Sequence, residues 1–110
     1  IYGREVTPNQ HALAERFGLT VLVPGPADRE TVNRVIFDEL CRGIVRSESR
    51  AAYQRIVEHH VRTGAEGVIS GCTEIAMLLG PDDVGVPLFD TGAIHAEAAA
   101  LWALGDPTDD

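Results

Sequence analysis

Apolar residues spaced three and four positions apart predict helices along the first half of this chain. The first helix is expected between Thr7 and Gly18, the second between Asp28 and Gly43, and the third between Ser47 and Gly64. Each begins at a capping residue and is stopped by a glycine. The second helix has its apolar face at Val32, Val35, Ile36 and Leu40. The third has its apolar face at Ala52, Tyr53, Ile56, Val57 and Val61.

Short apolar runs between and after these helices predict strands. The predicted strands cover residues 19–23, 67–70 and 86–89. A short helix over 75–79 and an alanine-rich helix over about 93–104 follow the second and third strands, and 106–110 is expected to be a disordered tail. This alternation predicts one α/β domain over 1–110, in which helices flank both faces of a parallel sheet with flavodoxin-like layering.

Composition narrows the possible functions. The 110 residues are 45% hydrophobic and carry a net charge of −8, which disfavours nucleic-acid binding. No apolar run is long enough to span a bilayer and no secretion signal opens the chain, so we expect a cytoplasmic protein that binds no membrane. Two cysteines and four histidines show no metal-binding spacing, and no metal is predicted. Because the chain opens at Ile1 without methionine, we expect a piece of a longer protein.

The strongest candidate for chemistry is the sequence Gly71-Cys72-Thr73-Glu74, which leaves a predicted strand and enters a helix. Ligands of parallel sheets gather where strands end, and Asp90 lies at another such end. The start of a helix favours the thiolate form of Cys72, whereas the charge of Glu74 opposes it, so the sign stays open. A buried, inert cysteine is the alternative, and we expect Cys41 to be one.

Two segments carry a resemblance to a known family. Residues 66–79, centred on Gly71-Cys72-Thr73-Glu74-Ile75, resemble the second active-site motif of the aspartate/glutamate racemase family. Residues 86–96 resemble the other C-terminal signature of these proteins, and 35–40 resembles one of their helices. The resemblance extends from about 18 to 104 and is closest to the aspartate racemase type. It implies an isomerase that works without pyridoxal phosphate or any other cofactor.

The resemblance also implies roles for individual residues. Cys72 is one of two acid/base groups that remove and return the α-proton of an amino acid from opposite faces. Thr73 is placed to bind the substrate carboxylate, and Arg46 to bind a side-chain carboxylate or else to lie in a solvated loop. Glu74 occupies the position where glutamate-specific relatives carry histidine. Asp90 lies at the cleft with Thr91, and His95 is expected to cap or pack.

These family members have two similar α/β halves, and the resemblance covers only the second. The missing N-terminal half would supply the opposite-face acid/base, so we expect the 110 residues alone to be inactive. A homodimer is expected for the whole protein. Gly92 stands where the family commonly has threonine, which weakens the hydrogen bonding inferred there. Rival interpretations are a hydantoin racemase, maleate isomerase or arylmalonate decarboxylase, or a non-catalytic remnant or binding module of the same fold.

Overall fold

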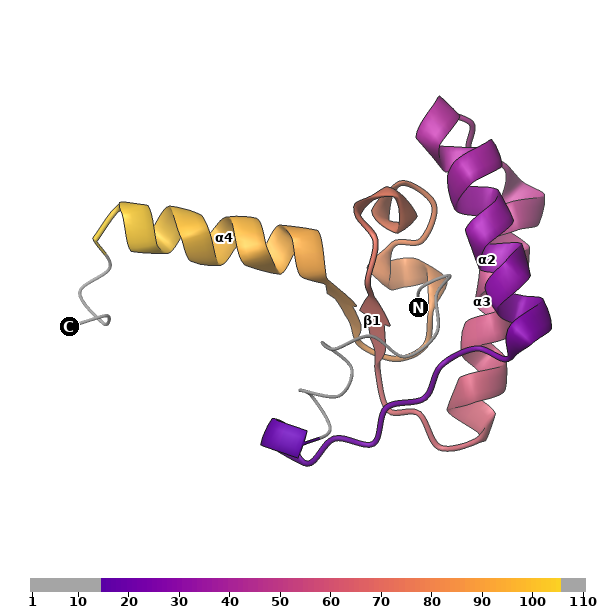
Figure 1. Ribbon diagram of the computed structural model, residues 1–110, viewed down its shortest axis with the longest axis horizontal. Helices are drawn as coiled ribbons and strands as arrows, with labels where there is room; N and C mark the ends of the chain where they lie inside the picture. The colour runs from indigo at the N-terminus through magenta and orange to yellow at the C-terminus, as the bar shows by residue number, and fades with distance from the viewer. Residues whose placement is uncertain (1–14, 106–110) are drawn as a thin grey trace.

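The computed structural model describes residues 15–105 of the chain (Figure 1). Strand β1 (Val68–Ser70) pairs in parallel with β2 (Leu88–Asp90), and Val68 lies opposite Leu88. Within the described residues the helices and short 3₁₀ turns are α2 (Pro26–Asp38), η1 (Leu40–Arg42), α3 (Ser47–Arg62), η2 (Thr73–Met77), η3 (Pro81–Asp83) and α4 (Thr91–Ala103). This arrangement of a parallel sheet with flanking helices confirms the predicted α/β class.

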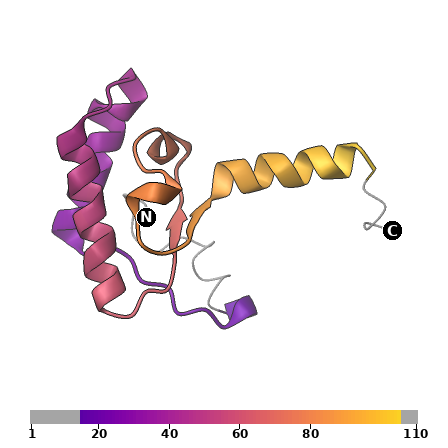
Figure 2. The ribbon, with the colours of Figure 1, turned by 180° about the vertical axis from the view of Figure 1, so that it is seen from behind.

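Helices α2 and α3 lie side by side and cover one side of the sheet (Figures 1 and 2). The apolar faces predicted for them bury Val32, Val35, Tyr53 and Ile56 in one core, which also takes in Ile75. Helix α2 begins at Pro26, two residues before the predicted cap at Asp28, because a proline already has a helical φ and lacks the amide hydrogen that a first turn leaves unpaired. Helix α3 begins near the predicted position, but Ser47 is its first helical residue and not its cap. The N-cap is Arg46, and no side-chain hydrogen bond caps the helix.

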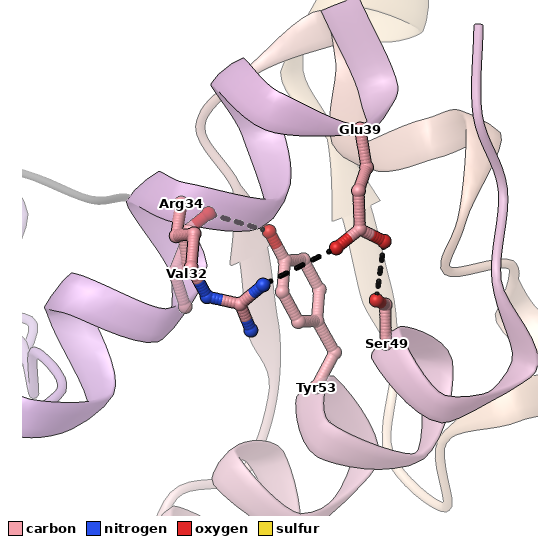
Figure 3. A network of polar contacts seen from close by, with 5 residues as sticks. All are labelled: Val32, Arg34, Glu39, Ser49 and Tyr53. Atoms are coloured by element: carbon pink, nitrogen blue, oxygen red, sulfur yellow. Dashed lines mark hydrogen bonds and ion pairs between the residues drawn. The ribbon is translucent and has the colours of Figure 1, made fainter.

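A buried polar network joins the two helices at the end of α2 (Figure 3). Glu39 is only 6% exposed, and its carboxylate accepts a 2.6 Å hydrogen bond from Ser49 and a 3.4 Å bond from Arg34. The buried Tyr53 hydroxyl donates to the carbonyl of Val32 at 2.9 Å. Buried polar groups need such partners, so the network fixes how α3 sits against α2.

The strand predicted over 19–23 is wrong. Residues 18–25 run as irregular backbone, and Leu19 and Leu22 point to solvent. A β-rich run becomes a strand only when a neighbouring strand is there to pair with it, and among the described residues none pairs with this one. The first predicted helix is described only at 15–17, before Gly18 with its φ of 66°; its start and the predicted tail lie outside the described residues.

Helix α4 differs from the others because it leaves the body of the molecule (Figures 1 and 2). None of its residues is buried, and Trp102 is 76% exposed. Among residues 15–105, no helix covers the side of the sheet opposite α2 and α3 (Figure 1), so the prediction of helices on both faces is met on one face there. Phe89 of β2 is 48% exposed. The large exposed apolar side chains of α4 are Ile94, Leu101 and Trp102.

Candidate active site

The two predicted chemical motifs meet at the C-terminal end of the two parallel strands. Ser70 and Asp90 end their strands directly opposite each other. The chain therefore enters η2 and α4 from the same end of the sheet. Cys72 is the residue that precedes η2. A β-carbon added to Gly92 would lie 3.1 Å from the Thr73 methyl group, which gives a physical reason for glycine at this position. The residue without a side chain lets the two motifs come into contact.

Cys72, Thr73 and Glu74 form a small hydrogen-bonded group. The Cys72 thiol donates to Glu74 Oε2 at 2.9 Å, and the Thr73 hydroxyl donates to the same oxygen at 2.9 Å. The Glu74 carboxylate therefore folds back over its own loop. Cys72 is half-buried, in contact with the hydrophobic core on one side and accessible on the other.

The electrostatics of Cys72 follow from this geometry. Burial raises the pKa of the thiol, and the hydrogen bond to Glu74 and the charge of that carboxylate raise it further. The backbone amides of Glu74 and Ile75 act in the opposite direction but do not prevail. Because η2 is a five-residue 3₁₀ turn rather than an α-helix, its dipole stabilises the thiolate only weakly. The sequence left open whether the pKa of Cys72 is raised or lowered. In this geometry it is raised, which favours the thiol over the thiolate.

Glu74 is perturbed in the other direction. The bond from the Cys72 thiol lowers the pKa of its carboxyl group, and the bond from Thr73 adds to this effect. Glu74 therefore stays ionised while it holds both donors. A carboxylate that accepts two hydrogen bonds on Oε2 is held in one orientation against the Cys72 sulfur.

Asp90 and Thr91 join the site to the start of α4. Asp90 Oδ1 accepts hydrogen bonds from the amides of Gly92 at 3.0 Å and Ala93 at 3.2 Å, which caps the helix. The Thr91 hydroxyl donates to the carbonyl of Ser70 at 2.9 Å and ties α4 to β1. Both residues lie at the predicted strand end, and their hydrogen bonds there hold the start of α4 in place.

Arg46 and Cys41 lie apart from this group. Arg46 is exposed and immediately precedes α3, and within residues 15–105 no hydrogen bond or ion pair joins it to Cys72, Thr73 or Glu74. Cys41 was expected to be buried in a helix, and this prediction is wrong. Helix α2 ends at Asp38, and the tighter η1 turn leaves Cys41 exposed.

Two supporting residues, both on α3, were not predicted from the sequence. Arg50 of α3 donates from Nε to the carbonyl of Leu78 at 2.8 Å, immediately after η2, and its Nε lies 3.9 Å from Asp83. Gln54, one turn later on α3, donates to the Asp83 carbonyl at 2.9 Å. These bonds hold the loop that follows Cys72 against α3. Two polar residues four apart on a helix carry no signal of such a role in the sequence.

Neither a metal site nor a membrane span is found in the part of the chain that the structure describes. No group of three or more histidine, cysteine, aspartate or glutamate side chains in residues 15–105 is arranged to hold a metal ion. No helix in the same residues combines the length and the apolar character needed to cross a bilayer.

The geometry defines a class of protein: a parallel α/β domain with a partly accessible thiol at the end of a strand. The Asp/Glu/hydantoin racemase family model matches residues 3–99, and the chain belongs to this family. It is similar to the crystal structure of a "putative Asp/Glu Racemase from Yersinia pestis", with 49% sequence identity and a TM-score of 0.79 over 86% of this chain. The match covers 41% of the Yersinia pestis chain, so the present chain spans less than half of that protein.

Proposed function

We propose that this chain supplies one of the two acid/base groups of a cofactor-independent amino-acid racemase of the aspartate type, and that Cys72 is that group. The observation that carries the proposal is a half-buried thiol at a strand end, hydrogen-bonded at 2.9 Å to Glu74, in a member of a racemase family. A thiol in this position is held in one direction and still reachable from outside. These are the requirements of a group that exchanges a proton with a bound substrate.

The remaining residues would bind the substrate around the sulfur. The amide of Thr73, at the start of η2, is suited to the α-carboxylate, where negative charge grows as the proton leaves. Asp90 and Thr91 shape the adjacent edge through their bonds to α4 and β1. Arg46 is kept as a candidate for a second substrate carboxylate, although it lies on a separate exposed turn.

The proposal includes a second domain that faces this one and carries the opposite acid/base. Two observations support it: the chain corresponds to 41% of the Yersinia pestis protein, and α4 and one side of the sheet expose apolar side chains. Large apolar side chains left exposed are typical of an interface. The 110 residues alone would then lack racemase activity, and the complete protein is expected to form a homodimer in the cytoplasm.

The test is a chimaera in which this chain replaces the matched part of the Yersinia pestis protein. Deuterium from solvent should enter the α-position of both D- and L-aspartate, and the two enantiomers should interconvert; the isolated chain should do neither. Circular dichroism checks that both proteins fold. A folded chimaera that exchanges no α-proton overturns the racemase proposal, whereas full inversion by the isolated chain overturns the need for a second domain.

A second substrate class is favoured by the family itself, whose description includes hydantoins. A hydantoin presents an acidic carbon–hydrogen bond next to a carbonyl group, so the same thiol could exchange its proton. The chimaera should therefore be offered aspartate, glutamate, a 5-substituted hydantoin and maleate in parallel. Aspartate is expected to be turned over fastest; a preference for hydantoin or maleate would replace the aspartate assignment and keep the role of Cys72.

A further inference from the structure

Glu74 is in an unusual position for a substrate-binding residue. Its carboxylate is turned toward the protein's own sulfur, with Oε2 accepting from both the Cys72 thiol and the Thr73 hydroxyl at 2.9 Å. A carboxylate that is available to bind a ligand has both of its oxygens open to solvent. Here one oxygen is already committed to the group that is proposed to carry the chemistry.

We propose that Glu74 is a positioning residue that keeps Cys72 as the thiol in the resting protein and directs its proton, so that this domain first acts as the proton donor. This inference rests on the racemase function proposed above. In the step it describes, the Sγ–H bond breaks and the proton passes to the carbanion carbon, whose electron pair forms the new C–H bond. The sulfur is left as the thiolate.

The same carboxylate then acts on the thiolate. Two negative charges on neighbouring groups repel each other, so the thiolate beside Glu74 is a stronger base than an isolated one. The α-proton of an amino acid is far less acidic than an ordinary thiol, and a more basic sulfur narrows this gap when the reaction runs in reverse. Glu74 therefore keeps the sulfur protonated at rest and makes the thiolate, once formed, the stronger base; it does not make the thiol a stronger acid.

Two further ionisable groups of the described residues lie on the elements around the sulfur. From α3, the Tyr53 hydroxyl faces this region, but burial raises its pKa and it stays neutral. From the β2–α4 edge, the carboxylate of Asp90 is bonded to the amides of Gly92 and Ala93. Among the described residues, Glu74 is the carboxylate bonded to the thiol.

The experiment measures how fast each thiol of the 110-residue chain is alkylated by iodoacetamide across a range of pH, with peptide masses separating Cys72 from Cys41. Glu74→Gln removes the charge and keeps the shape of the side chain. Glu48→Gln, on the exposed first turn of α3, removes the same charge away from the site. Cys41 is exposed and serves as a second control within each molecule.

The alkylation rate of Cys72 at neutral pH should rise severalfold in Glu74→Gln, and its pH profile should move toward lower pH, while Cys41 and the Glu48→Gln protein stay unchanged. Thr73→Ala keeps the charge of Glu74 and removes only its second donor, so the alkylation rate of Cys72 should not rise in this variant as it does in Glu74→Gln. An unchanged or slower Cys72 in Glu74→Gln overturns the inference.

The two proposals fail separately. The alkylation experiment needs no turnover, so it tests the coupling of Glu74 to Cys72 even if the chimaera proves inactive. In an active chimaera, Glu74→Gln should shift the pH profile of racemisation in the same direction as that of alkylation. A drop in rate with no shift in either profile would show a merely structural role and would overturn the inference while leaving the racemase function in place.

Discussion

Helices α3 and α4 are similar in length but differ in what holds them in place. Helix α3 buries Tyr53 and Ile56 against α2 and is joined to it by the network around Glu39. Helix α4 buries none of its residues and is attached to the body through the cap at Asp90 and the bond from Thr91. Helix α3 therefore contributes to the stability of the core, whereas the apolar side chains of α4 stay exposed and could contact another surface.

The largest effect should come from truncating matched isoleucines on the two helices. Ile56 of α3 is 5% exposed and Ile94 of α4 is 51% exposed. Ile56→Ala should lower the free energy of unfolding by about 2–5 kcal/mol, because it removes buried methyl groups and leaves a cavity. Ile94→Ala should change it by about 0.5 kcal/mol or less. Urea unfolding of the 110-residue chain measures the free energy of unfolding of both variants. Equal losses would contradict the conclusion that α3 belongs to the core and α4 does not.

The buried network of α3 should show the next effect. Ser49→Ala leaves an oxygen of Glu39 buried without its 2.6 Å donor, which should cost about 1–3 kcal/mol. Ser47→Ala, two residues earlier at the exposed start of the same helix, is the matched control and should be close to neutral. If thermal unfolding shows the two variants to be alike, the Glu39 network does not stabilise the helical layer.

Removing the cap of α4 should have a smaller and local effect. Asp90→Ala deletes the acceptor for two backbone amides, a loss of about 0.5–2 kcal/mol for the helix. Amide hydrogen exchange should become faster in α4 and stay unchanged in α3, because α4 shares little of the core. Glu97→Ala, on the exposed surface of α4, serves as the control. Faster exchange throughout the chain would mean that α4 is coupled to the core after all.

The smallest effect should appear at alkaline pH. Burial and Glu74 raise the pKa of Cys72 above its ordinary value of 9.0, so the unfolded chain loses this proton first. The stabilisation is therefore complete below that pH and is lost as the pH rises through the higher value of the folded protein. Cys72→Ser should reduce the fall in stability on the alkaline side, and Cys41→Ser should leave it unchanged. An identical alkaline limb in all three proteins would contradict the perturbed thiol.

Much of the fold was predictable because its signals are local. The span of α3 and the strands before Cys72 and Asp90 follow from apolar spacing and short apolar runs. The run over 19–23 has the same local signal, yet it forms no strand. Whether such a run pairs depends on a neighbour elsewhere in the fold, which the sequence pattern does not reveal.

The candidate site was predictable in position but not in its bonds. Strand ends placed Cys72 and Asp90 on one edge, as the parallel register requires. The return of Glu74 onto Cys72 depends on the η2 turn, and the support from Arg50 depends on how α3 packs against the loop. Neither follows from residue type or spacing, because the first depends on the local conformation of the turn and the second on tertiary packing.

The measurement that bears most directly on the account is the exchange of the aspartate α-proton in D₂O by the chimaera with Cys72→Ala, beside Cys41→Ala as the matched thiol control. We expect Cys72→Ala to lower exchange by about 10²- to 10⁴-fold, the usual contribution of a positioned acid/base, and Cys41→Ala to leave it unchanged. Exchange that persists at the full rate without the Cys72 sulfur would contradict the central claim.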